Sequence, residues 1–219
     1  MTLLMLLCTL CADQASPHKQ LLDRFLAPEE TPLVSYQAVR RLSASTRGGK
    51  TRADMEVLTV FDPERGFRFT VLSESGSGLI RRKVLLAALE AEQKIVSKAA
   101  RDESALTPAN YEFQPLEPTV EAPAAIGVRA RRKSVTLVNG TLFVHPERAD
   151  LERVEGELAD RPSFWTKRVR INRRYERIDG VHVPVLMESI ADVRVVGAST
   201  FTMAYRYTEI NGRKVPPTP

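Results

Sequence analysis

Cysteine is almost absent from this sequence, and its scarcity excludes several kinds of chemistry. The 219 residues contain two cysteines, Cys8 and Cys11, both within the first twelve positions. If that segment is removed, the rest of the chain forms no disulfide, no thiolate metal site and no cysteine nucleophile. The three histidines, His18, His145 and His182, are far apart and lack metal-binding spacing. We therefore expect neither a metal nor a cofactor.

Catalytic signatures are also missing. The Gly-x-Ser-x-Gly elbow of serine hydrolases does not occur. Residues 44–51 satisfy a relaxed phosphate-loop pattern, but such a loop needs a helix after it, and strand-like alternation follows here. Asp150, Glu152, Glu155 and Glu157 lie on an expected strand whose alternation divides them between two faces. The sequence predicts no enzyme, and catalysis by residues distant in sequence is kept as the alternative.

The most apolar segment is too short to cross a membrane. Met1–Ala12 carries no charge, and twelve residues at about 1.5 Å each do not span a hydrocarbon core of roughly 30 Å. Such a run is typical of the h-region of a secretory signal peptide, with cleavage expected after Ala12, although no Lys or Arg precedes it. We therefore expect a periplasmic or otherwise extracytoplasmic protein, with residues 1–12 as leader and 13–219 as a single domain. Lipidation of Cys8 or Cys11 is disfavoured because a leucine precedes each.

Fourteen prolines and eleven glycines indicate many turns, which suits a β-rich domain better than a helical bundle. Period-two alternation predicts an antiparallel meander of three strands within residues 36–42, 51–61 and 67–72. Asn139-Gly140 predicts a hairpin turn between strands 134–138 and 141–144. Further strands are expected at 151–158, 164–178, 181–196 and 199–208. Residues 18–26 predict a short N-terminal helix.

One long helix is expected between the two groups of strands. Residues 79–101 contain no Gly or Pro, and apolar residues recur every three or four positions, including Ile80, Val84 and Ala88. The fold class is therefore mainly β (α+β): a curved antiparallel sheet with one long amphipathic helix and a short N-terminal helix.

Strand 165–175 is basic on one face and apolar on the other. Arg168, Arg170 and Arg174 share the basic face and are candidates to contact an anionic head group. A solvated outer face is the alternative interpretation. Nucleic acid is the least favoured partner, because the aromatic residues alternate onto the opposite side and do not interleave with the cations. The excess charge of +5 suits an anionic membrane surface.

Apolar residues on several strands and on the helix are the candidate walls of a ligand cavity. A curled sheet buries its inner face in one of two ways: a helix fills it completely, or the helix covers a gap that a ligand occupies. The candidate wall residues are Phe67, Phe69, Val71, Ile80, Val84, Trp165, Val169, Ile171, Phe201, Met203 and Tyr205.

The chain resembles the superfamily of bacterial outer-membrane lipoprotein-sorting proteins (LolA/LolB-like). The similarity is strongest from Gly140 to Val215, where residues 139–144, 150–156, 175–184 and 201–205 occur in the order of that group's paired strands. The resemblance implies an unclosed half-barrel with helices across its concave face, a hollow that accepts acyl chains, and no enzymatic activity or cofactor.

Two functions follow as expectations. The first is a monomeric, non-catalytic, extracytoplasmic carrier or sensor that holds the acyl chain of a lipid or lipidated protein. The second is a structural or protein-interaction module with a solid core and no ligand. Whether the space beneath the long helix is open or filled by side chains distinguishes them.

Overall fold

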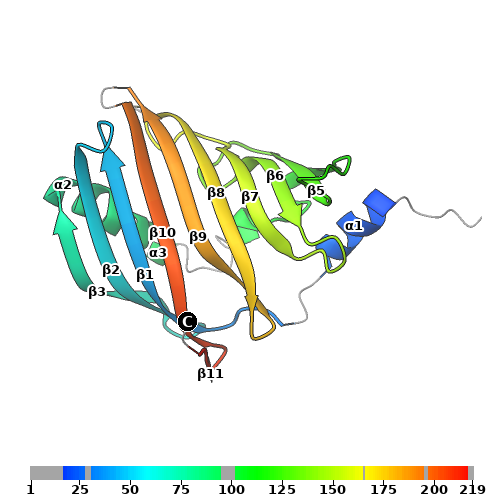
Figure 1. Cartoon of the computed structure of the whole chain (residues 1–219), viewed down its shortest axis with the longest axis horizontal. Coiled ribbons are helices and arrows are strands. Elements are labelled where there is room, and N and C mark those ends of the chain that lie inside the picture. The colour runs from blue at the N-terminus through cyan, green and yellow to red at the C-terminus, as the bar shows by residue number, and fades with distance from the viewer. Residues whose placement is uncertain (1–16, 28–30, 95–101, 165, 195–196, 217–219) are drawn as a thin grey trace, which may run out of the picture.

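One antiparallel sheet forms most of the molecule (Figure 1). The computed structural model describes residues 17–27, 31–94, 102–164, 166–194 and 197–216. The strand order is β3-β2-β1-β10-β9-β8-β7-β6-β5-β4, and β11 pairs with β10. The sheet is curled and remains open, with β3 at one edge and β4 at the other. The predicted fold class, a curved and unclosed antiparallel sheet with one long and one short helix, is confirmed.

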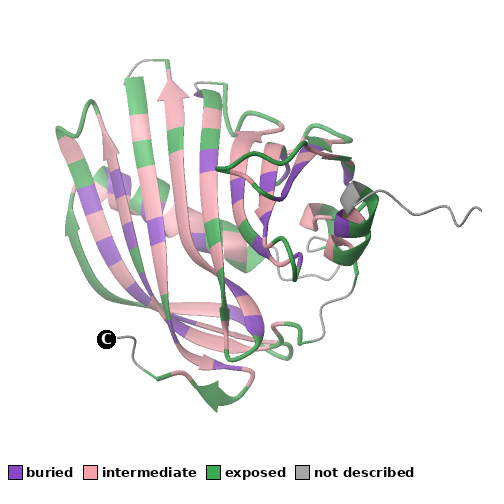
Figure 2. Cartoon of the chain, turned by 45° about the vertical axis from the view of Figure 1, so that its right-hand side comes forward, coloured by how far each residue is buried: buried purple, intermediate pink, exposed green. Residues whose placement is uncertain are grey.

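The strands follow the alternation of the sequence, and on β1 and β2 buried residues alternate with mostly half-buried ones (Figure 2). Their bounds are Tyr36–Thr46 (β1), Thr51–Asp62 (β2), Gly66–Gly76 (β3), Tyr111–Pro115 (β4), Ala125–Ala130 (β5), Val138–Val144 (β6), Leu151–Leu158 (β7), Thr166–Ile178 (β8), Val181–Val193 (β9), Gly197–Ile210 (β10) and Arg213–Lys214 (β11). The phosphate-loop-like segment forms the β1–β2 hairpin, in which Arg47, Gly48 and Gly49 have positive φ. Asp179 and Gly180 likewise form the predicted β8–β9 turn with positive φ.

The long helix packs on one face of β1, β2 and β3, which we call the inner face. It consists of α2 (Gly78–Ile80), a π-helical segment η1 (Arg81–Leu86) and α3 (Ala87–Lys94). Ile80, Leu85 and Leu89 are its buried residues and join a cluster with Leu42, Val57 and other strand residues. The rest of the predicted helix, residues 95–101, lies outside the described residues.

The π-helical segment changes which helix face is buried. An uninterrupted 3.6-residue period places Val84 beneath Ile80, but a π-turn closes over five residues and brings Leu85 there instead. Leu85 is fully buried, whereas Val84 is 38% exposed. The expectation that Val84 belongs to the buried face was therefore wrong, because the sequence periodicity was interpreted with an ideal α-helix.

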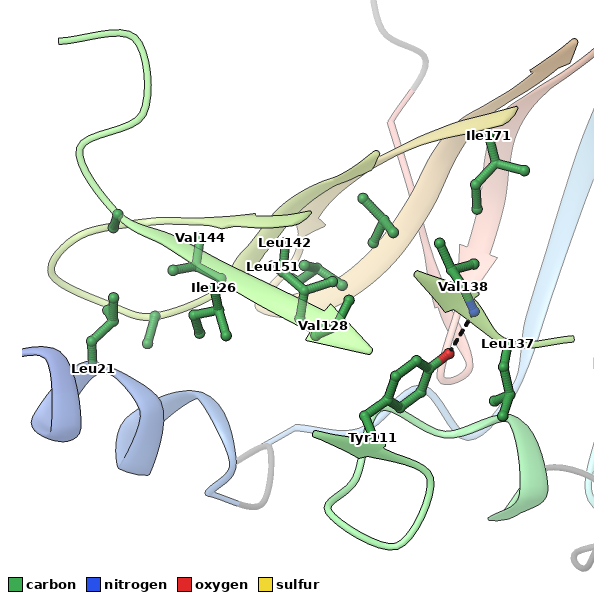
Figure 3. Packing of buried hydrophobic residues seen from close by; sticks show 13 residues of the cluster. Leu21, Tyr111, Ile126, Val128, Leu137, Val138, Leu142, Val144, Leu151 and Ile171 are labelled. Atoms are coloured by element: carbon green, nitrogen blue, oxygen red, sulfur yellow. Dashed lines mark hydrogen bonds between the residues drawn. The ribbon is translucent and has the colours of Figure 1, made fainter. Parts of the chain in front are cut away.

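The other half of the inner face has its own apolar cluster and the short helix α1 (Pro17–Phe25). Figure 3 shows Leu21 of α1 facing Ile126 and Val144. The Tyr111 hydroxyl accepts a hydrogen bond of 3.1 Å from the backbone N–H of Val138. Two helices thus cover two parts of the same sheet, near its opposite edges.

The Asn139-Gly140 hairpin is a correction, because both residues lie inside β6. Gly140 pairs with Gly156 of β7. A Cβ at Gly140 would lie 2.0 Å from the Glu155 carbonyl oxygen, and a Cβ at Gly156 would lie 2.3 Å from that of Asn139. Glycine is needed here for the close approach of two backbones, and it does not form a turn.

Candidate functional site

A row of cross-strand partners crosses the inner face. From β2 to β5 it contains Met55, Leu42, Met203, Met187, Arg173, Val154, Leu142 and Ile126. Every member except Arg173 is apolar. Both ends of the row are buried, and its two central members, Met187 and Arg173, are only half-buried. Coverage of the inner face is therefore thinnest at its centre.

On the helix-covered side, Arg40 of β1 is 1% exposed and is compensated by a carboxylate. Its two terminal nitrogens, Nη1 and Nη2, donate to the Glu92 carboxylate of α3 at 2.6 and 2.9 Å. Nη2 also donates to the Tyr36 hydroxyl at 2.5 Å. The guanidinium lies 4.5 Å from the ring centre of Tyr205 and 4.9 Å from that of Phe67. This pair joins the sheet to the last turns of the helix.

Burial and pairing act in opposite directions on Arg40. Burial disfavours the charged guanidinium, but the hydrogen-bonded Glu92 carboxylate more than offsets it, so the pKa of Arg40 lies above its ordinary value. Burial also raises the pKa of the phenols of Tyr36, Tyr205 and Tyr207. The polar groups of this region therefore comprise one ion pair surrounded by neutral phenols.

Arg173 on β8 has similar neighbours but a different balance of charge. Its Nη2 lies 3.5 Å from the Met187 sulfur, as Nη1 of Arg40 lies 3.6 Å from the Met203 sulfur. Its buried Nε has no hydrogen-bond partner. Among the described residues, no carboxylate forms an ion pair with Arg173. The Tyr175 phenol favours its charged form more than burial opposes it, so the pKa of Arg173 lies above the ordinary arginine value.

Most predicted wall residues within the described ranges lie on the inner face. Cross-strand pairing places Phe67, Phe69 and Val71 opposite inner-face residues of β2. By the same alternation, the other predicted wall residues on strands also lie on this face: Val169, Ile171, Phe201, Met203 and Tyr205. Phe67, Ile80, Ile171 and Met203 are buried, whereas Phe69, Val169, Phe201 and Tyr205 are half-buried. Val71 stays 39% exposed on the edge strand, and Trp165 lies outside the described residues.

The three predicted head-group arginines lie on the opposite, outer face. Arg168, Arg170 and Arg174 are exposed and alternate with Val169, Ile171 and Arg173. Arg168 pairs with Glu157 at 3.4 Å. A ligand on the inner face is separated from these three side chains by the sheet itself. Arg173 lies on the opposite, apolar face of this strand and was assigned no role from the sequence.

Two hollows on the described surface lie away from the helix. One, of about 320 Å³, is lined by residues 121–124 and by parts of β6–β8, including Phe143, Arg153 and Arg174. The other, of about 400 Å³, lies beside the β2–β3 turn. The helix-covered part of the inner face is instead occupied by side chains, among which Leu42, Leu85 and Leu89 are at most 1% exposed.

The loops at the two ends of the sheet carry opposite net charge. The β1–β2 and β9–β10 loops lie at one end and the β8–β9 loop at the other (Figure 1). Because neighbouring strands are antiparallel, each remaining loop that joins two neighbouring strands can be assigned to one of these ends. Those at the first end hold seven cationic residues and one carboxylate: Arg47, Lys50, Arg131, Arg132, Lys133, Arg161, Arg194 and Asp160. Those at the second end hold six carboxylates and two arginines: Glu64, Glu117, Glu121, Glu147, Asp150, Asp179, Arg65 and Arg148.

The basic end also exposes apolar side chains. Phe164 is 70% exposed, and the Arg194 guanidinium lies 4.6 Å from its ring centre.

Within the described residues, no group of three or more His, Cys, Asp or Glu side chains is placed to hold a metal ion. The helices in that part of the chain include none with the length and hydropathy of a membrane span.

Comparisons with known proteins give similarities in structure. No family model matches the chain, and no curated protein matches it. A crystal structure of a LolA superfamily protein from Nitrosomonas europaea is similar with a TM-score of 0.44 and 14% identity, covering 92% of this chain and 96% of that one. A DUF1329 family protein from Desulfovibrio piger is similar with a TM-score of 0.40 and 10% identity, covering 87% of this chain and 88% of that one.

Proposed function

We propose that the protein binds the acyl chain of a lipid or lipidated protein on the inner face of its sheet and acts as a non-catalytic extracytoplasmic carrier or sensor. The observation that supports this is the incomplete cover at the centre of that face. Met187 is half-buried at this centre, and Phe201 and Tyr205 are half-buried at the margin of the helix-covered cluster. Apolar surface left in a concave sheet favours an apolar ligand.

The energetics suit a single acyl chain. Each methylene removed from water contributes about 0.8 kcal/mol, so a fully buried sixteen-carbon chain contributes a gross affinity of roughly 13 kcal/mol. The extracytoplasmic location rests on the apolar leader and remains part of the proposal, as does contact of the basic end with an anionic membrane surface.

Titration with oleyl alcohol, a neutral single-chain lipid, tests the acyl site, together with native mass spectrometry of gently purified protein. We expect saturable binding at one site. Met187→Trp fills the centre of the inner face and should weaken binding at least tenfold, whereas Leu186→Trp, one residue along on the outer face, should leave it unchanged. Absence of any bound or exchangeable lipid in the unaltered protein would contradict the proposal.

A solid-core interaction module is the second candidate. Leu85 and Leu89 are completely buried, and neither described hollow lies under the helix. A protein that binds no single-chain lipid, with a helix that stays protected from amide hydrogen exchange, would support this candidate.

A further inference from the structure

The inner-face row has one charged member, and its position is unusual. Arg173 stands between Met187 and Val154, with three apolar residues beyond Met187 in one direction and Val154, Leu142 and Ile126 in the other. A guanidinium in apolar surroundings is costly unless a counter-charge and hydrogen-bond acceptors meet it. Neighbouring phenols keep the Arg173 guanidinium charged, so the sequence places a cation without an ion-paired carboxylate at one of the two half-buried positions of this row.

Arg40 shows how the same surroundings look when the charge is compensated. Both arginines contact a methionine sulfur, and those methionines, Met203 and Met187, are direct partners across β10 and β9. Arg40 has the Glu92 carboxylate at 2.6 and 2.9 Å. Both arginines have a buried Nε without a hydrogen-bond partner, but Arg173 has no ion-paired carboxylate among the described residues. What Arg173 lacks is an anion with two oxygens.

We propose that Arg173 is the head-group site of the inner face and that the ligand is an anionic single-chain amphiphile. Its carboxylate or phosphate accepts hydrogen bonds from the guanidinium, and its acyl chain lies along the apolar row. This inference rests on the proposed function and adds to it the sign of the ligand's charge and the residue that recognises it. Planar guanidinium groups suit both carboxylate and phosphate oxygens.

Three ligands with the same oleyl or oleoyl chain test the inference on the full chain: oleate, oleoyl lysophosphatidic acid and oleyl alcohol. The unaltered protein should bind one or both anions about 10- to 100-fold more tightly than the alcohol, the range expected for hydrogen bonds to a charged group. The two anionic ligands distinguish a carboxylate from a phosphate head.

Arg173→Met should abolish this preference, so that the variant binds the anions no more tightly than it binds the alcohol, because methionine offers no donor to an anionic head group. Arg173→Lys should keep part of the preference. The matched control is Arg174→Met, which removes the neighbouring guanidinium on the outer face and should retain the full preference. Thermal denaturation confirms that each variant is folded.

The outcomes separate the two proposals. Equal affinity for the alcohol and the anions in the unaltered protein, or an anion preference that survives Arg173→Met, overturns the head-group site and leaves the acyl site standing. Loss of alcohol binding in Arg173→Met to the same extent as anion binding shows a structural role and also overturns it. If the unaltered protein binds none of the three ligands, the proposed function fails and the head-group site fails with it.

Discussion

The helix-covered side of the inner face and its centre hold the same kinds of side chains and differ in how they are closed. On the helix-covered side, Leu85 and Leu89 fill the space above the strands, and Glu92 neutralises Arg40. At the centre, Met187 and Arg173 are half-buried, and no described carboxylate is paired with Arg173. The first region is fully packed, as in a protein core. The second contains the same kinds of side chains, but they are only half covered and Arg173 has no described carboxylate partner.

Truncation of a buried side chain of the helix should have the largest effect on stability. Leu85→Ala removes a fully buried side chain and should lower the free energy of unfolding by about 3 kcal/mol, the usual cost of such a cavity. Val84→Ala, on the neighbouring exposed position, should cost less than about 0.5 kcal/mol. Urea denaturation measures both. Equal costs would show that the π-helical segment is not the conformation in solution.

Removal of the Glu92 charge should leave Arg40, like Arg173, without an ion-paired carboxylate. Glu92→Gln leaves Arg40 buried without a charge partner and should cost about 2 kcal/mol; the value is below that of a fully buried pair because the Glu92 side chain is 39% exposed. Glu90→Gln, an exposed position on the same helix, is the control and should be neutral. A neutral effect of Glu92→Gln would mean that the pair does not hold the helix.

The smallest expected effect is on stability at the centre. Arg173→Met removes a guanidinium without an ion-paired carboxylate from an apolar row and should leave the free energy of unfolding unchanged or raise it by about 1 kcal/mol. Arg40→Met should instead lower it, because Glu92 loses its partner. A clear loss of stability in Arg173→Met would show that Arg173 is satisfied within the protein, and the contrast between the two arginines would disappear.

Much of the fold could be predicted from the sequence, because alternation and turn residues act locally. The early meander and the Asp179-Gly180 turn follow from such signals. The Asn139-Gly140 hairpin was wrong because the same two residues also serve a close approach between strands, and that requirement comes from Gly156 on another strand. The burial of Leu85 in place of Val84 depends on a π-turn that no residue pattern advertised.

The candidate site was predicted only in part for the same reason. The apolar wall residues are numerous, and their alternation places them on one face. The roles of Arg40 and Arg173 depend instead on what lies opposite them. A carboxylate 52 positions away neutralises one arginine, and nothing in the local sequence distinguishes the other from a solvated cation. Residue type alone therefore favoured the exposed Arg168, Arg170 and Arg174 as anion contacts.

The separation of charge between the two ends of the sheet gives the molecule a permanent electric dipole along its strands. If the basic end contacts an anionic bilayer, as we propose, the field exerts a torque that turns this end toward the surface over a range of about 8 Å at physiological salt. The β7–β8 loop with Phe164 and the β9–β10 loop with Arg194 then approach first, and the carboxylate-bearing loops trail in the solvent. Added salt should shorten that range and randomise the approach while leaving the fold intact.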